Sequence, residues 1–308
     1  RLSKIKFFDP ACGSGNFLII TYKELRFLEV KIIQRLIELE NAEIELKVQT
    51  RLNFKGGDIT EIPATQKKID FSGHQSKFYF PQIQLTQFYG IEIKDFAHEM
   101  AILSLWLAEH QMNLYFDEKL EGFGKSEPIL PLKQAGNIVA GNAARKNWEE
   151  VCPKNEGDEI YIIGNPPYLG SRNQDAEQKS DMEFVFRKDY KNLDYVLIWF
   201  YKGAKFIENC NAQLALVSTN SICQGEQVSL FWPKILNDII EISFAHQSFK
   251  WTNNAIGNAG VTVIIVGLRN KSTKPKYLYN NNIRREAKNV NAYLLDSADI
   301  IIVPRNKS

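Results

Sequence analysis

The side chains best suited to chemistry lie in residues 159–170, with the sequence EIYIIGNPPYLG. The apolar first half predicts a short buried strand, and the two prolines, Pro166 and Pro167, prevent a strand or helix from continuing. Asn165 and the Pro166 carbonyl can accept hydrogen bonds from a planar amine, and Tyr168 offers a flat ring for stacking. Such a site could grip a nucleobase by its amino group. An ordinary strand-ending turn is the alternative, because Asn-Pro and Pro-Pro pairs mark turns routinely.

A glycine-rich turn follows the first predicted strand and precedes a predicted helix. Glycines let the backbone approach a ligand closely, and a helix N-terminus favours polar ligand groups. The turn has neither the GxGxxG fingerprint nor the Lys-Ser/Thr of a phosphate loop. Its acid and small residues suit a cofactor with a cationic amino-acid tail. The turn consists of Asp9, Pro10, Ala11, Cys12, Gly13, Ser14, Gly15 and Asn16.

Two further polar residues end predicted strands. Glu92 could bind both hydroxyls of a ribose. Asn142 could hydrogen-bond an adenine ring, although an Asx turn explains it equally well. Ligands of parallel sheets bind beyond the carboxyl ends of the strands. We therefore expect Glu92, Asn142, Asn165 and the glycine-rich turn to lie together at one sheet edge.

Strands alternate with helices along the chain, which predicts an α/β fold with a mostly parallel sheet and helices on both faces. Residues 50–86 and 171–191 are expected to be irregular insertions, the second a mobile loop beside the site. Phe249 is expected in a loop. Strands are predicted at 5–8, 88–93, 136–142, 160–163, 213–217, 239–244 and 261–268, and helices at 17–48, 96–112, 194–207 and 224–236.

The composition is that of a globular protein, with 44% hydrophobic and 24% charged residues among 308. The net charge of +2 gives no global basic signature, so a nucleic acid would have to meet a local patch. Four cysteines without a C-x-x-C pair argue against a zinc site or a disulfide framework and fit a reducing cytoplasm. No stretch approaches the apolar length of a membrane span.

The expected domain organisation is a catalytic domain over residues 1–270 followed by a basic linker over residues 271–308. Basic residues greatly outnumber acidic ones between residues 269 and 288, so this stretch could track a phosphate backbone or be a solvated linker. The chain begins without Met, opens almost directly into a strand and ends just after an apolar run. We therefore expect a fragment of a longer protein.

Together, Asp9-Pro-Ala-Cys-Gly-Ser-Gly15 and the later Asn165-Pro-Pro-Tyr168 resemble the motifs of DNA amino-methyltransferases. The order of the motifs is similar to that of adenine-specific enzymes of the gamma type. The wider pattern resembles the methylase modules of fused type IIG/IIL, MmeI-type restriction–modification enzymes, over most of residues 5–270. Further counterparts are Gly90-Ile-Glu-Ile93, Asp194-Tyr195, Ser218-Thr-Asn220 and Phe249-Lys-Trp251.

The resemblance implies a Rossmann-like, seven-stranded methyltransferase fold that uses S-adenosylmethionine. Asp9 and the glycine-rich turn would hold the methionine part, and Glu92, with Ile93 beside it, would hold the ribose. Asn142 would stand near the adenine, although many relatives carry Asp at this position. Asp194 would line the cofactor pocket, with a helix N-cap as its alternative role. No metal is implied.

In the implied reaction, Asn165 and the Pro166 carbonyl bind the amino group of the target adenine, and Tyr168 stacks on the flipped base. Phe249 is a candidate for a second stacking ring, although an aromatic side chain in an apolar segment is more often part of the core. Methyl transfer would be direct, without a Cys nucleophile, so Cys12 is expected to be packed.

The implied partner is duplex DNA with a flipped adenine, and a target-recognition domain and a nuclease would lie outside these residues. Three alternatives remain open. The same chemistry could serve a protein-glutamine or RNA amino-methyltransferase, since Asn-Pro-Pro-Tyr can hold any planar amide or amine. Cytosine could be the target base. The chain could also be a non-catalytic, methylase-like scaffold that binds DNA.

Overall fold

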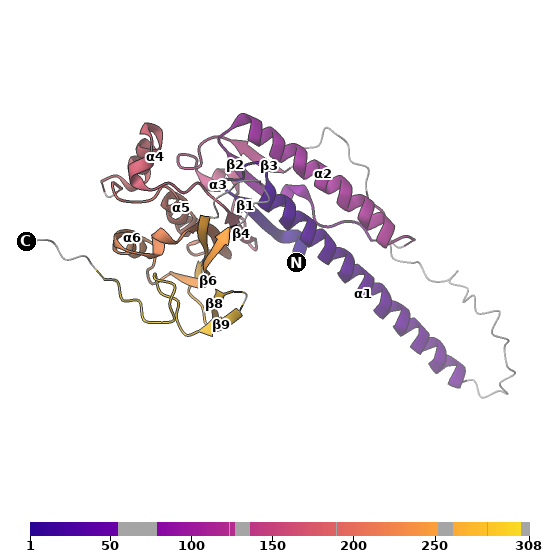
Figure 1. Cartoon of the computed structure of the whole chain (residues 1–308). Coiled ribbons are helices and arrows are strands. Elements are labelled where there is room, and N and C mark those ends of the chain that lie inside the picture. Colours follow the sequence, from indigo (N-terminus) through magenta and orange to yellow (C-terminus); the bar gives the residue numbers. More distant parts are fainter. Residues whose placement is uncertain are drawn as a thin grey trace, which may run out of the picture. The chain divides into compact units, whose positions relative to one another are not determined.

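Figure 1 shows the computed structural model of the chain. The chain divides into two compact units. All the predicted site residues belong to the first unit. The units comprise Arg1–Ile20, Leu85–Trp106 and Gln134–Ser308 in the first, and Thr21–Gln84 and Leu107–Lys133 in the second. The structure describes residues 1–54, 79–122, 124–126, 136–188, 190–251, 261–281 and 283–302.

The described residues of the first unit form a nine-stranded sheet with the order β3-β2-β1-β4-β5-β7-β6-β8-β9. Strands β3, β2, β1, β4 and β5 are all parallel, and β7 runs antiparallel between β5 and β6. The carboxyl ends of β1 to β6 therefore share one edge, as expected from the sequence. The strands are β1 Ile5–Asp9, β2 Phe88–Glu92, β3 Asn137–Ala140, β4 Glu159–Gly164, β5 Ala212–Thr219, β6 Ile240–Trp251, β7 Val261–Asn270, β8 Lys276–Asn280 and β9 Ile283–Ala287.

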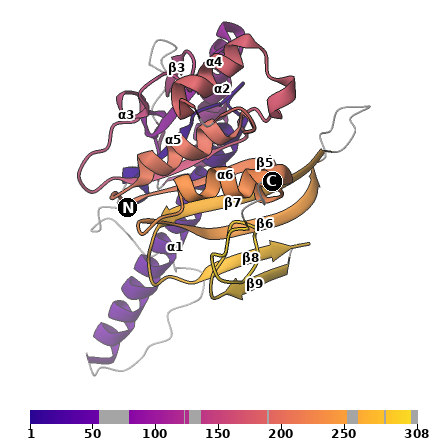
Figure 2. The ribbon, with the colours of Figure 1, turned by 90° about the vertical axis from the view of Figure 1, so that its left-hand side faces the viewer.

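The main core lies between the sheet and the helices α5 and α6, which run along the same sheet face (Figure 2). Phe8 of β1, Ile162 of β4 and Leu214 of β5 belong to this core. Side chains alternate between the two faces along a strand, and these three point to the same face. Helix α5 approaches β5 closely, because a Cβ on Gly203 would lie 2.5 Å from Leu214 Cδ1. The helices are α1 Asn16–Phe54, α2 Asp95–Lys119, α3 Trp148–Val151, α4 Ala176–Phe186, α5 Leu197–Ile207 and α6 Glu226–Phe231.

The opposite face of the sheet carries a row of stacked aromatic rings. Phe7 of β1 stacks on Phe88 of β2 and on Tyr161 of β4, with ring centroids 5.3 and 5.8 Å apart. The start of α2 belongs to this side of the first unit, because Leu105 lies within contact distance of the point where Gly136 would carry a Cβ. Helices therefore cover both faces, as predicted.

The second unit contains the rest of α1 and α2, joined by a buried polar cluster. Arg26 is buried and donates from Nη1 to Asn113 Oδ1 (3.0 Å), which links the two helices. Glu29 Oε1 accepts hydrogen bonds from the backbone N–H groups of Gln82 and Ile83 (2.6 and 3.1 Å). These bonds fix the chain before β2 against α1. Burial raises the pKa of Glu29.

Residues 171–191 are not the mobile loop that the sequence suggested, because they contain α4. This helix begins with a capping box in which Asp175 and Gln178 each accept a backbone hydrogen bond from the other residue (2.8 and 3.0 Å). The polar composition masked this short helix. Of the other predicted insertion, near 50–86, residues 55–78 lie outside the described part of the chain.

The stretch predicted to be a basic linker, residues 271–308, differs from that expectation because β8 and β9 continue the sheet. Part of the basic charge in this region is neutralised within the fold. Arg269 Nε lies 2.8 Å from Glu241 Oε1, and Lys276 Nζ lies 2.9 Å from Glu241 Oε2. These two cations lower the pKa of Glu241 against the opposing effect of burial. Phe249 also differs from expectation, since β6 extends through it.

None of the helices in the described part of the chain has the length and hydropathy that crossing a bilayer requires.

Candidate active site

The glycine-rich turn leaves the sheet at Asp9, the last residue of β1. Asp9 is 1% exposed, and its Oδ1 accepts a hydrogen bond from the Ala11 N–H (3.0 Å). Gly13 and Gly15 have φ angles of 55° and 84°, which glycine adopts without strain. The Gly15 N–H donates to the Cys12 carbonyl (2.8 Å), and α1 begins at the next residue. The turn thus has the strand–turn–helix geometry predicted from its sequence.

The buried carboxyl group of Asp9 also touches the second motif. A Cβ on Gly164, at the end of β4, would lie 2.5 Å from Asp9 Oδ1. Burial raises the pKa of Asp9 to about 7, the Ala11 N–H opposes this shift, and the negative charge of Glu92 adds to it. Near neutral pH the group is therefore present in both its neutral and its ionised form. A cationic ligand beside it would favour the ionised form.

Glu92, at the carboxyl end of β2, ties this strand to the glycine-rich turn. Its Oε2 accepts from the Gly13 N–H and its Oε1 from the Lys94 N–H, both at 2.9 Å. The side chains of Ile93 and Phe96 beside it are 58% and 79% exposed. A carboxylate next to exposed apolar side chains suits a ligand that combines hydroxyl groups with a heterocyclic ring. The sequence analysis did not single out Phe96, which lies in the first turn of α2.

Cys12 is packed rather than reactive. Its backbone N–H donates to the Ile91 carbonyl (3.1 Å), and a Cβ on Gly90 would lie 2.9 Å from its Sγ. Burial raises the pKa of this thiol, and the charges of Asp9 and Glu92 raise it further. A thiol held neutral in this way is a poor nucleophile.

The segment after β4 presents an unused hydrogen-bond acceptor. We call residues 165–169 the NPPY loop. Asn165 Oδ1 is buried and has no hydrogen-bond partner among the described residues. Pro166 is buried, and Tyr168 is half-buried against the main core. Buried acceptors are nearly always paired in folded proteins, so this oxygen is a candidate contact for a ligand.

The far end of the NPPY loop is held at both backbone groups of Leu169. Its N–H donates to Asp194 Oδ1 (2.9 Å), and its carbonyl accepts from the Tyr195 N–H (3.0 Å) and from Gln174 Nε2 (3.1 Å). Asp194 also accepts from the Val196 N–H (3.2 Å), and burial raises the pKa of its carboxyl group. Asp194 therefore positions the loop, while its contact with a cofactor stays a prediction.

The Asn142 side chain forms the Asx turn that was the alternative to a ligand contact. Its Oδ1 accepts from the Ala144 N–H (2.8 Å), and its Nδ2 donates to Asp181 Oδ2 (2.8 Å). The amide group is thereby oriented, and its role beside an adenine stays a prediction. Phe249 lies on β6 with its ring edge-on to His246, at 6.4 Å between centroids. Its stacking role also stays a prediction, and the side chain of Trp251 is outside the described residues.

Three residues that sequence reasoning missed support these turns from the helices. Trp199 of α5 donates from Nε1 to the Pro10 carbonyl (3.0 Å), which holds the glycine-rich turn. Lys202 of α5 and Asp181 of α4 both bind the segment that starts at Asn142. Their sequence positions carry no motif, because each acts on a segment distant along the chain.

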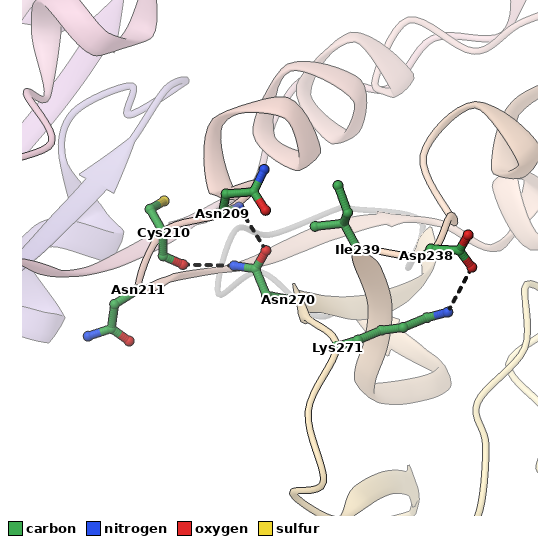
Figure 3. Close-up of a pocket in the computed structure, with 7 residues that line it drawn as sticks. All are labelled: Asn209, Cys210, Asn211, Asp238, Ile239, Asn270 and Lys271. Atoms are coloured by element: carbon green, nitrogen blue, oxygen red, sulfur yellow. Dashed lines mark hydrogen bonds and ion pairs between the residues drawn. The ribbon is translucent and has the colours of Figure 1, made fainter.

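One surface hollow of the described residues lies away from these turns. It has a volume of about 500 Å³ and lies at the opposite sheet edge, where β5 and β6 begin and β7 ends (Figure 3). Asn270 in this hollow donates from Nδ2 to the Cys210 carbonyl (2.7 Å) and accepts at Oδ1 from the Asn209 N–H (3.0 Å). Its polar groups hold the loops that form it, so it is not the candidate active site.

Comparisons with known proteins show which family the chain is similar to. A family model described as "MmeI, DNA-methyltransferase domain" matches residues 1–280. DNA methyltransferase A of Bacillus subtilis (strain 168) is 47% identical over 310 residues, which cover 100% of this chain and 31% of that protein. The structure of the type IIL restriction–modification enzyme MmeI in complex with DNA matches with 37% identity and a TM-score of 0.79, over 99% of this chain and 37% of its own.

This chain therefore spans about a third of the length of these two relatives. The matches confirm the resemblance stated from the two motifs, and they confirm the Rossmann-like methyltransferase fold. The sheet extends that fold by two strands, β8 and β9. The chain belongs to the family of MmeI DNA-methyltransferase domains.

Proposed function

We propose that this chain is the catalytic domain of an enzyme that methylates the exocyclic amino group of adenine in DNA, with S-adenosylmethionine as the donor, in a restriction–modification system. The family match supports a DNA methyltransferase. The observation that carries the chemistry is the buried, unpaired Oδ1 of Asn165, which lies directly after the strand that Asp9 touches. An acceptor buried without a partner costs about 1–3 kcal/mol, and an amino group of a ligand would remove that cost.

The residues around the glycine-rich turn fit the proposed cofactor. The turn is open at Gly13, where an added Cβ would have no neighbour within 4 Å among the described residues. Asp9 and this turn would hold the methionine part, Glu92 the ribose hydroxyls, and Asn142, with Ile93, the adenine. Asp194 would line the pocket from the NPPY loop side. The bound cofactor supplies an electrophilic methyl group on a sulfonium.

The chain's own part in the reaction is positioning and electrostatics. Asn165 Oδ1 and the Pro166 carbonyl would accept the two hydrogens of the target amino group, which draws the nitrogen lone pair out of the ring. The same two oxygens would stabilise the positive charge that develops on nitrogen as the new N–C bond forms. The methyl–sulfur bond of the donor would break in the same displacement and leave a neutral thioether. The methylated nitrogen would then lose one proton to bulk water. Tyr168 would stack on the flipped base, with Phe249 as a second candidate ring, and hold the nitrogen about 3 Å from the methyl carbon.

The partner in this proposal is duplex DNA with one base turned out of the helix. Recognition of a particular DNA sequence, and any nuclease activity, would belong to parts of the protein outside residues 1–308. We place the reaction in the cytoplasm, where such a substrate lies.

The proposal is tested with the full-length protein, duplex DNA and S-adenosylmethionine that carries a labelled methyl group. The DNA is digested to nucleosides and analysed by mass spectrometry. We expect labelled N6-methyladenine from the wild type and label formed about 10²- to 10³-fold more slowly by Asn165→Ala. Labelled N4-methylcytosine would move the target to cytosine. Labelled protein or RNA, with unlabelled DNA, would overturn the proposal, as would the absence of cofactor binding in calorimetry.

A further inference from the structure

We propose that Asp181 is a positioning residue that couples the cofactor side of the site to the base side, by joining the Asn142 turn (residues 142–146) to the NPPY loop. This inference rests on the proposed function. Asp181 lies on α4, within the stretch that the sequence suggested to be a loop, and no motif marks it.

Three donors converge on the buried carboxylate of Asp181, which is 3% exposed. Its Oδ2 accepts from Asn142 Nδ2 (2.8 Å) and from the Tyr195 hydroxyl (2.9 Å). Its Oδ1 accepts from Arg145 Nε (2.7 Å). Two of the donors belong to the Asn142 turn and the third lies on the segment before α5, so one carboxylate binds two separate parts of the site.

The segment before α5 holds the NPPY loop. The backbone N–H of Tyr195 donates to the Leu169 carbonyl (3.0 Å), and the neighbouring Asp194 accepts from the Leu169 N–H (2.9 Å). An unbroken series of contacts thus runs from Asn142 through Asp181 and Tyr195 to the residue that follows Tyr168. All its hydrogen bonds are 3.0 Å or shorter.

A second residue makes the Asn142 turn a rigid body. Lys202 Nζ donates to the carbonyls of Ala143, Ala144 and Lys146 at 2.6, 3.0 and 2.7 Å. These three bonds tie the turn together, so we expect a displacement of Asn142 to carry the whole turn with it. Lys202 Nζ also lies 5.4 Å from the centroid of the Trp148 ring. The Asp181 carboxylate bonds both the turn and the Tyr195 hydroxyl, so it can pass a displacement of the turn on to Tyr195.

The physical consequence is thermodynamic coupling between the two ligands. A carboxylate with three directional donors holds them in one geometry. A ligand that fixes Asn142 would restrict the motion of Tyr195 and the NPPY loop. Base binding would then lose less conformational entropy, because the loop is already ordered. By linkage, DNA must then strengthen cofactor binding by the same factor.

The test measures the affinity of the full-length protein for S-adenosylhomocysteine by calorimetry, with and without duplex DNA that carries the target site. Couplings of this kind are typically about 5- to 150-fold. We expect a factor in this range for the wild type and a factor close to one for Asp181→Asn and Tyr195→Phe. Tyr195→Phe removes one hydroxyl group and keeps the ring. Glu183→Gln, an exposed acid on the same helix, is the matched control and should keep the wild-type factor.

Thermal unfolding of each variant shows whether a lost coupling factor reflects misfolding. If Asp181→Asn does not fold, Tyr195→Phe alone tests the inference. A wild-type factor that persists in folded Tyr195→Phe would overturn the inference, as would a wild-type factor of one. The wild type could bind S-adenosylhomocysteine, with Asp9→Ala abolishing that binding, while Tyr195→Phe keeps the wild-type coupling factor. That result would overturn the inference about Asp181 and leave the proposed function standing. Failure of the wild type to bind S-adenosylhomocysteine would remove the proposed function and this inference with it.

Discussion

The carboxyl group of Asp9 lies against the backbone of Gly164, so closely that a Cβ on Gly164 would be 2.5 Å from Asp9 Oδ1. Asp9 opens the glycine-rich turn, and Gly164 is the last residue before Asn165. The two motifs are separated by about half of the chain, yet they meet at the ends of the adjacent parallel strands β1 and β4. This contact makes the geometry of each motif depend on the other.

Gly164→Ala should destabilise the protein by about 1–3 kcal/mol, because overpacking a buried site forces neighbouring groups to shift. Chemical denaturation monitored by circular dichroism measures this change. Gly170→Ala is the matched control, since an added Cβ there meets no described atom within 4 Å and its φ of −58° suits alanine. Asp9→Ala should reduce the penalty of Gly164→Ala, and equal penalties in both backgrounds would contradict the contact.

Binding of S-adenosylmethionine should strengthen as pH rises through 7. Burial raises the pKa of Asp9 from 3.8 to about 7 in the free protein, and a cationic ligand favours the ionised form. Below pH 7 binding must release a proton, so affinity should fall by up to about tenfold per pH unit. Calorimetry at several pH values, in buffers of different ionisation enthalpy, measures both the affinity and the released proton.

The same shift has the opposite effect on the stability of the ligand-free protein. A carboxyl group whose pKa is raised by folding contributes stability that is fully present below pH 3.8 and is lost as pH rises through about 7. Asp9→Asn should remove this dependence and should flatten the pH profile of binding. If the affinity of the wild type for S-adenosylmethionine does not change between pH 6 and 8, the role assigned to Asp9 is contradicted.

Asn165→Ala should reduce the rate of methyl transfer by a factor of about 10²–10³, the usual effect of removing one group that stabilises developing charge. Affinity for S-adenosylhomocysteine should stay within about twofold, because Asn165 faces the target base in the proposed complex. Single-turnover kinetics with labelled cofactor measure the rate. Asn165→Asp keeps the acceptor oxygen and should retain more activity than Asn165→Ala, and the reverse order would argue against the amine-gripping role.

Asp175→Ala should weaken α4 by about 1 kcal/mol, because Asp175 caps the first turn. Since α4 carries Asp181, the variant should also lower the coupling between DNA and S-adenosylhomocysteine. Hydrogen exchange of the α4 amides and the calorimetric coupling factor report the two effects. Lys179→Ala, at an exposed position of the same helix, should change neither.

The parts of the fold that the sequence predicted well are those with a strong local signal. Strands β1, β2 and β4 are largely apolar, and polar residues stand at their carboxyl ends: Asp9 ends β1, Glu92 ends β2 and Asn165 follows β4. Pro10 stops β1, and Gly164 is the last residue of β4. The rule that ligands bind beyond such ends was sufficient to assemble these residues into one candidate site.

The parts that were missed lack a local signal or depend on distant partners. Helix α4 buries only Asp181, Met182 and Phe186, so its apolar periodicity is weak and its capping box was the available clue. The region of β8 and β9 looked like a linker because basic residues outnumber acidic ones between residues 269 and 288. The role of Asp181 was invisible because Tyr195 and the Asn142 turn lie on separate elements, and only folding brings them together.

Strand β9 forms an outer edge of the sheet, and it exposes Arg284, Arg285 and Glu286 to solvent. An unpaired strand edge offers free backbone groups to any other strand, which invites aggregation. If two copies of β9 paired, desolvation of these charges and the proximity of arginines from both copies would oppose the contact. The Arg284 guanidinium also lies over the ring of Tyr277, 4.9 Å from the ring centroid, so the charge stays near this edge of the sheet. We therefore expect the basic residues that made this region look like a linker to oppose pairing between the β9 strands of two copies.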